Sequence, residues 1–105
     1  MYNYKTKLVK IIDGDSIVLD VDLGFHITAR ETIRLLNVDA PETRTLDLVE
    51  KARGNKVKDL VSHVLTGASD IELMSKKQDK YGRWLGVVIV DGHNLNELVE
   101  KWSKE

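Results

Sequence analysis

The sequence predicts a β-rich α+β fold, a five-stranded Greek-key barrel of the OB type with two main helices. In the first half of the 105-residue chain, apolar and polar residues alternate at the two-residue period of strands. Two further stretches, one central and one near the end, place apolar residues at helical spacing. The resulting order of three strands, a helix, two strands and a helix suits a small barrel with a helix inserted after the third strand.

Five segments carry the strand pattern. An apolar run at residues 8–12 precedes residues 16–22, in which Ile17, Leu19 and Val21 share one face. Residues 23–25 indicate a turn, and a β-rich stretch follows over residues 26–38. Pro41 lacks an N–H and disfavours helical geometry before it, so this strand should end there. Residues 71–73 and 85–90 are the last two predicted strands.

Two helices complete the predicted fold. The middle one carries an apolar stripe at i, i+3, i+4, i+7 and i+8, and it should end at Gly67. The last one begins at Asn94, a residue suited to the N-cap, with Glu97 three positions on as in a capping box. The two stripes consist of Val57, Leu60, Val61, Val64 and Leu65, and of Leu95, Leu98, Val99 and Trp102.

Length and composition restrict the class of protein. A chain of 105 residues builds one domain, here residues 1–105, and its content of 42% hydrophobic and 31% charged residues is that of a folded globular protein. Nothing approaches an apolar run of membrane-spanning length. Because there is no cysteine, disulfides and thiolate metal sites are excluded. The first residues lack the apolar core of a signal peptide, which leaves a cytoplasmic protein or a mature exported form as expectations.

The charge balance bears on possible partners. Sixteen basic residues stand against seventeen acidic ones, for a net charge of −1. A protein that binds nucleic acid by counterion release is usually basic overall. Nucleic-acid binding by this chain would therefore need a local basic patch and a metal cation that offsets the carboxylates.

Acidic residues gather at two predicted strand ends. Asp13 and Asp15 flank a glycine, a pattern that suits a tight turn as well as a metal site. A closed barrel can bring Asp15 and Asp39 to one rim, where two carboxylates and the backbone carbonyl of Ala40 would form part of the oxygen shell of a hard cation. Glu42, three residues beyond Asp39, would then face a metal-held water as a general base.

Two arginines complete a possible phosphate site. Arg34 interrupts an apolar strand, which fits either a solvent-facing position or a phosphate-binding one. Together with Arg83 it offers two planar guanidinium groups that match the oxygens of a phosphoryl group as it gains negative charge. Lys80 and Tyr81 could contact a neighbouring phosphate, although a polar turn would also explain Lys80.

The charged residues described above lie in three segments: DGDS at residues 13–16, RLLNVDAPET at residues 34–43 and DKYGR at residues 79–83. These segments resemble the signature blocks of the staphylococcal-nuclease-like (thermonuclease) family. The blocks occur in the family's order, and the similarity runs over nearly the whole chain. The resemblance implies an OB-fold barrel and calcium-dependent hydrolysis of DNA and RNA. It also implies that the P–O5′ bond is broken, which leaves 3′-phosphate ends.

The resemblance assigns roles residue by residue. Asp15 and Asp39 match calcium-ligating carboxylates, and Ala40 matches a position that contributes its backbone carbonyl. Asp13 matches a carboxylate that acts indirectly on the metal, and Glu42 matches the residue assigned to water activation. The phosphate-binding arginines correspond to Arg34 and Arg83, and the contacts to a terminal phosphate correspond to Lys80 and Tyr81.

The sequence therefore predicts a monomeric, calcium-dependent nuclease that acts on DNA or RNA and not on membranes. The family's familiar member continues beyond the position of Glu105 with a tyrosine pair lining a nucleobase pocket, so weaker substrate binding is expected here. The alternative is a non-catalytic nucleic-acid-binding or protein-binding module on the same barrel, a class in which carboxylates or arginines are usually lost. A purely structural calcium-binding domain is disfavoured because two carboxylates and a carbonyl are too few.

Overall fold

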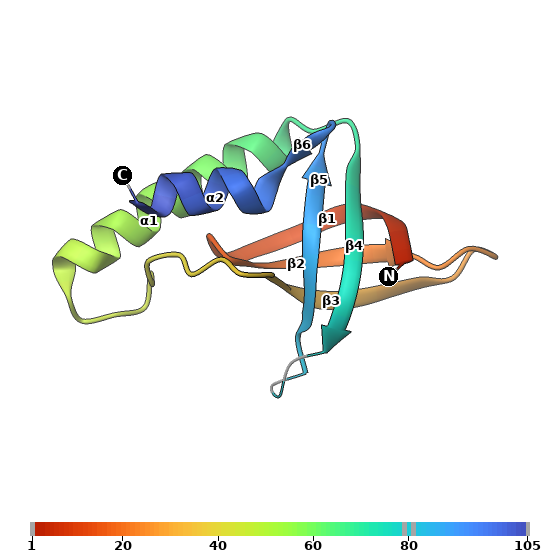
Figure 1. Cartoon of the computed structure of the whole chain (residues 1–105), viewed down its shortest axis with the longest axis horizontal. Coiled ribbons are helices and arrows are strands. Elements are labelled where there is room, and N and C mark those ends of the chain that lie inside the picture. The colour runs from red at the N-terminus through yellow and green to blue at the C-terminus, as the bar shows by residue number, and fades with distance from the viewer. Residues whose placement is uncertain (1, 79, 81, 105) are drawn as a thin grey trace.

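The structure, a computed structural model, describes residues 2–78, 80 and 82–104. Figure 1 shows a strongly curved sheet with two helices lying side by side along one end of it. The elements are β1 (Tyr2–Asp13), β2 (Ser16–Asp22), β3 (Thr28–Leu35), α1 (Leu48–Thr66), β4 (Ile71–Gln78), β5 (Trp84–Val90), β6 (His93–Asn94) and α2 (Leu95–Lys104).

The strands close into a barrel. Their order is β3-β2-β1-β4-β5-β6, and β3 pairs additionally with β5, which joins the first strand of the order to the fifth. All neighbouring pairs are antiparallel except β3–β5, which is parallel and joins Ile33 to Trp84, Arg34 to Leu85 and Leu35 to Gly86. β6 adds only two residues beside β5. The five-stranded barrel with two main helices predicted from the sequence is therefore confirmed.

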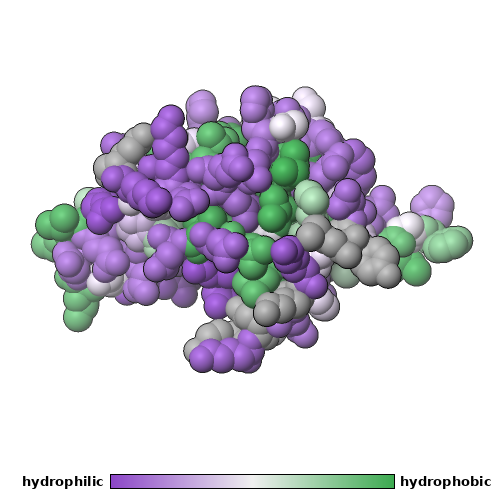
Figure 2. All heavy atoms as spheres, viewed as in Figure 1, coloured by the Kyte–Doolittle hydropathy of each residue, from purple (hydrophilic) through white to green (hydrophobic). Residues whose placement is uncertain are grey.

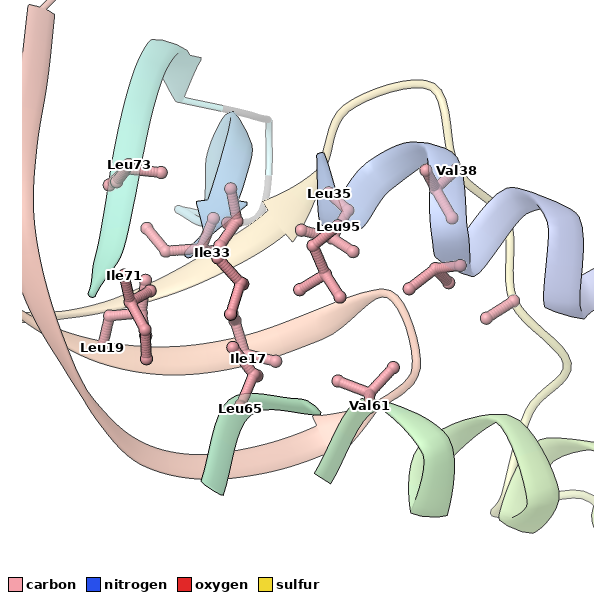
Figure 3. Close-up of a cluster of buried hydrophobic side chains, with 14 of the residues drawn as sticks. Ile17, Leu19, Ile33, Leu35, Val38, Val61, Leu65, Ile71, Leu73 and Leu95 are labelled. Carbon is pink, nitrogen blue, oxygen red and sulfur yellow. The ribbon is translucent and has the colours of Figure 1, made fainter. Parts of the chain in front are cut away.

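The strand β2 shows how the alternation of the sequence builds the interior. Ile17 and Leu19 are fully buried and Val21 is nearly so, as their shared face predicts. Figure 3 shows Ile17 and Leu19 of β2 meeting residues from β3, β4 and both helices in one cluster. Burial of this apolar surface is the main favourable contribution to folding. The labelled members are Ile17, Leu19, Ile33, Leu35, Val38, Val61, Leu65, Ile71, Leu73 and Leu95.

Three strands differ by more than one residue from the sequence prediction, and one of them is β4, which continues beyond residue 73 to Gln78 because it pairs with β5 up to Trp84. β1 begins at Tyr2, well before the apolar run at residues 8–12, because its polar first half pairs with β4, as in Tyr4↔Leu73. β3 ends at Leu35 and does not continue to residue 38. Asn37 turns the chain there with a left-handed φ of 60°, which asparagine tolerates better than most residues, and the N–H of Val38 bonds to the carbonyl of Leu35.

The helix α1 has defined ends. Asp47 is its N-cap: Oδ1 accepts hydrogen bonds from the N–H groups of Val49 and Glu50 at 3.0 and 3.3 Å. At the other end the N–H of Gly67 bonds to the carbonyl of His63, so the predicted stop is confirmed. The buried face consists of Gly54, Val57, Val61 and Leu65.

The Asp47 cap gives a stability prediction. Replacing Asp47 by alanine leaves two N–H groups of the first turn without their acceptor and should lower the free energy of unfolding by about 1 kcal/mol. Urea unfolding would measure this loss. Asp59→Ala, at an exposed position in the middle of the same helix, is the control and should change stability little. Equal midpoints for the two variants would contradict the assigned cap.

One asparagine caps the helix α2, and a second one ties it to the barrel. Oδ1 of Asn94 accepts a hydrogen bond from the N–H of Glu97 at 3.2 Å, so the predicted cap is confirmed. Asn96 is buried, and its amide bonds to backbone groups of β5 and of the residue after β3. α2 is thereby fixed against the seam where the barrel closes.

Large hydrophobic residues are exposed at both ends of the long axis. Figure 2 shows hydrophobic surface at these two ends, which correspond in Figure 1 to the β2–β3 connection and to the region where α1 begins. Within the described part of the chain, no helix is long and apolar enough to cross a membrane. The exposed side chains are Leu23, Phe25 and Ile27 at one end and Leu46, Leu48 and Val49 at the other.

Candidate functional site

One guanidinium group lies between two of the predicted metal ligands. Nη1 of Arg34 is 3.2 Å from Oδ2 of Asp15, and Nη2 is 3.7 Å from Oδ1 of Asp39. The Asp15 side chain is only 12% exposed, whereas that of Asp39 is 98% exposed. The structure therefore brings two carboxylates and one arginine, predicted from separate segments, to one place on the barrel rim.

Asp15 is held by backbone and side-chain donors. It lies in the tight turn between β1 and β2, and its Oδ2 accepts the N–H of Ala40 at 2.9 Å. Its Oδ1 accepts the hydroxyl of Ser16 at 3.3 Å. A buried carboxylate needs such partners because an unpaired charge in the interior is costly. The Asp15 carboxylate thereby joins the β1–β2 turn to the loop that follows β3.

Arg34 is engaged with the loop as well as with the carboxylates. Its Nη1 donates to the carbonyl of Leu35 at 3.3 Å and also to the carbonyl of Val38. Both of these hydrogen bonds are made by Nη1 of the guanidinium. The sequence prediction placed Arg34 and Asp39 on one strand, and this is wrong. The strand β3 ends at Leu35, and Asp39 lies in the loop that follows.

The loop from Asp39 to Thr43 carries Glu42 and is anchored to Asp13. Ala40 is buried and Glu42 is exposed to solvent. The hydroxyl of Thr43 donates to Oδ1 of Asp13, which anchors the far side of the loop to the end of β1. Asp13 thus contacts the loop directly, while Glu42 projects from the segment between the two anchors.

The donors at this rim suit a hard cation. Carboxylate and carbonyl oxygens are the ligands that calcium prefers. Among the described residues, no three His, Cys, Asp or Glu side chains gather closely enough to hold a metal ion. Asp15 and Asp39 can therefore supply only part of an oxygen shell, and a carbonyl, water and substrate would have to supply the rest. The donor set fits the predicted calcium in kind, and Arg34 offsets part of the negative charge of the two carboxylates.

The parallel pairing of β3 with β5 brings the second arginine near the first. Arg34 pairs with Leu85, and Arg83 stands two positions before Leu85, directly ahead of β5. This register places Arg83 beside the strand that carries Arg34. The two arginines, which are distant in sequence, thus reach the same edge of the barrel.

The remaining predicted substrate contacts lie in the β4–β5 connection. Lys80 is exposed in the turn after β4. Tyr81, and Asp79 of the same motif, lie outside the described residues. Lys80 is therefore placed on the segment that leads to Arg83, and the role assigned to Tyr81 stays a prediction.

A cavity of about 450 Å³ lies at the barrel mouth away from the helices. Tyr4 and Trp84 contribute aromatic walls, and Glu31 and Lys76 contribute charged groups. None of the predicted site residues lines it. The cluster of carboxylates and arginines is therefore an open surface site and not part of this cavity.

A second arginine–carboxylate pair on the β2–β3 hairpin differs from the Arg34 cluster. Nε of Arg30 donates to Oδ1 of Asp20 at 2.8 Å on the exposed surface. The hydrogen bonds from Arg30 lower the pKa of the Asp20 carboxyl and raise the pKa of the guanidinium. This pair has no link to the loop after β3 among its described contacts, and Arg30 serves below as a control.

The sequence motifs assign no role to three residues at the site, although Thr43 is the last residue of the motif at residues 34–43. Thr43 anchors the loop, Asn96 bonds to the carbonyl of Leu36 at 3.1 Å, and Gly54 of α1 lies against the backbone of Glu42. A glycine inside an otherwise helical stretch is the one feature that could have indicated such a contact.

Comparisons with known proteins show the family of this chain. A family model described as "Staphylococcal nuclease homologue" matches residues 32–101, which is 70 of the 105 residues. The chain is 29% identical over 96 residues to the thermonuclease of Staphylococcus hyicus, covering 90% of the chain and 54% of that protein. It is 33% identical over 88 residues to the micrococcal nuclease of Shigella flexneri, covering 82% and 42%.

A third relative shows the same similarity within a much larger protein. The chain is 35% identical over 106 aligned positions to endonuclease YhcR of Bacillus subtilis (strain 168), covering 92% of the chain but 8% of that protein. The chain thus spans about half the length, or less, of these curated relatives. The family match takes in two thirds of the chain and includes the loop after β3, the helix α1 and the approach to β5. The chain therefore belongs to the staphylococcal nuclease homologue family.

Proposed function

We propose that residues 1–105 act as one domain that hydrolyses phosphodiester bonds of DNA or RNA in a calcium-dependent reaction and leaves 3′-phosphate ends. The observation that carries the proposal is the position of Arg34 between Asp15 and Asp39. The names of the relatives, thermonuclease, micrococcal nuclease and endonuclease, support a nuclease activity.

The metal-binding residues in this proposal are Asp15, Asp39 and the backbone carbonyl of Ala40. Bound calcium would supply positive charge and a water that loses its proton more readily than bulk water. The carboxylates differ in burial: Asp15 is buried and bonded to the N–H of Ala40, whereas Asp39 is almost fully exposed. Asp13 contributes indirectly by holding Thr43.

Proton transfer and charge stabilisation fall to three side chains. Glu42 is exposed on the loop and would accept the proton of the attacking water. Arg34 and Arg83 would offset the negative charge that the phosphoryl oxygens gain as the bond to the 5′-oxygen breaks. Lys80 and Tyr81 would contact a neighbouring phosphate and orient the strand.

Chelation and a carboxylate variant test this function. Single-stranded DNA and RNA should be cleaved with calcium and left intact with chelator, and the products should carry 3′-phosphates by mass spectrometry. Glu42→Gln should lower kcat by about 10²- to 10⁴-fold. Glu100→Gln, the same change on the exposed face of α2, should leave kcat unchanged.

A binding module on the same barrel is the second candidate. The exposed hydrophobic residues at both ends of the molecule favour it, because such surface often marks contact with a partner. A folded protein that binds nucleic acid in millimolar calcium without cutting it would contradict the nuclease and support the module.

A further inference from the structure

Gly54 occupies an unfavourable position for its residue type. It lies in the interior of α1 and is buried, although glycine is the poorest helix former after proline. A Cβ at this position would lie 2.5 Å from the carbonyl oxygen of Glu42 and 2.8 Å from that of Pro41. Both are backbone atoms, so they cannot rotate out of the way. The helix therefore needs glycine here because the loop after β3 rests directly on it.

The loop segment is fixed on both sides of this contact. Before it, the N–H of Ala40 bonds to Asp15 at 2.9 Å, and after it the hydroxyl of Thr43 bonds to Asp13. Between these anchors the backbone of Glu42 packs on Gly54. The two hydrogen bonds fix the ends of the segment, and the helix surface limits how far its middle can move inward.

The same face of α1 also supports the β1–β2 turn. A Cβ at Gly14 would lie 2.6 Å from Cγ1 of Val57 and 3.2 Å from Cβ of Ala40. Val57 follows Gly54 by three residues, which places both on one side of the helix. One helix face therefore sets the positions of both segments that carry the site carboxylates.

We propose that Gly54 is a positioning residue for Glu42, an inference that rests on the function proposed above. Cβ atoms essentially never approach other atoms closer than 3.0 Å, so alanine at position 54 requires the helix and the Glu42 carbonyl to separate by at least half an ångström from the present 2.5 Å. A displacement of about 1 Å at a catalytic group can cost on the order of 10²-fold in rate. Gly54 acts through the loop backbone and does not touch the substrate.

Gly54→Ala tests the proposal against Gly67→Ala. Gly67 ends the same helix, and a Cβ there would lie 3.6 Å from the carbonyl oxygen of His63, an ordinary contact. We expect kcat to fall by about 10- to 10²-fold in Gly54→Ala with a smaller change in KM, and to stay unchanged in Gly67→Ala. An undiminished kcat in folded Gly54→Ala would overturn the proposal.

A double variant separates positioning from general damage. In the Glu42→Gln background the side chain that Gly54 positions no longer accepts a proton, so Gly54→Ala should cause little further loss of kcat. The same fold-loss in both backgrounds would mean that the substitution acts independently of Glu42, and the positioning role would be wrong.

Two further measurements remain decisive if the first assay fails. NMR tests the placement even if the wild type cleaves nothing. NOEs should connect the Gly54 α-protons to Glu42, and in Gly54→Ala the amide shifts should be confined to residues 40–43. If these are seen without cleavage, only the proposed function fails.

If Gly54→Ala does not fold, a glycine inserted between Arg44 and Thr45 lengthens the loop. The insertion alone should stay active and the insertion with Gly54→Ala should be slow. Equal rates would overturn the proposal.

Discussion

Replacing Arg83 by alanine is expected to lower kcat for phosphodiester cleavage by on the order of 10²-fold or more. The guanidinium would face oxygens whose negative charge grows in the transition state, and removal of one such donor typically has this effect. Arg83→Lys keeps the charge but loses the planar fork. Its kcat should therefore lie between the kcat of the wild type and that of Arg83→Ala. Steady-state kinetics on a short single-stranded DNA would measure all three proteins.

The neighbouring arginines supply the controls for Arg83. Arg30→Ala removes an exposed guanidinium that pairs with Asp20, and it should leave kcat unchanged. Arg34→Ala is less informative, because Arg34 also contacts Asp15 and the carbonyl of Val38, so stability and rate should fall together. An Arg83→Ala protein with undiminished turnover would refute the proposed role.

The largest expected loss of stability follows the replacement of Asn96 by alanine. Oδ1 of Asn96 accepts the N–H of Val88 at 3.1 Å, and Nδ2 donates to the carbonyls of Leu36 and Gly86, each at 3.1 Å. Each buried group left without a partner costs about 1–3 kcal/mol. Because the carbonyl of Gly86 keeps a bond from the N–H of Leu36, we expect a total loss of about 3 kcal/mol.

Such a loss is a large share of the roughly 5–15 kcal/mol that stabilises a typical domain. Urea unfolding followed by tryptophan fluorescence would measure it. Asn94→Ala is the matched control, since it removes a single capping bond to the N–H of Glu97 and should cost about 1 kcal/mol. Equal unfolding midpoints for the two variants would contradict the importance of the buried amide.

The sequence predicts those parts of the fold that depend on local pattern. Ile17, Leu19 and Val21 face the interior as their period requires, and the stop at Gly67 and the cap at Asn94 are found where the residue types indicate. These features need only a strand, a helix end or a single side-chain bond. Residues close to them in the sequence are therefore enough to specify these features.

Other parts depend on distant partners and escaped prediction for that reason. The polar start of β1 is a strand because Thr6 pairs with Ile71 of β4. The first turn of α1 carries exposed apolar residues, so its start depends on the Asp47 cap and not on a stripe. At the site, the three segments indicate which residue types gather, but the bonds of Arg34 to its own loop and the contact of Gly54 with Glu42 arise only in the folded chain.

The closure of the barrel has a kinetic consequence. Among the described residues, three pairs join β3 to β5, and they link positions half the chain apart, as in Ile33 and Trp84. Contacts of such high sequence separation carry a large loop-closure entropy, so they are expected to form late in folding and to open early in native-state fluctuations. Because Arg34 and Arg83 lie on opposite sides of this seam, each opening separates them. Hydrogen exchange of the amides that pair β3 with β5 would thus report how often this pairing opens and separates the two arginines.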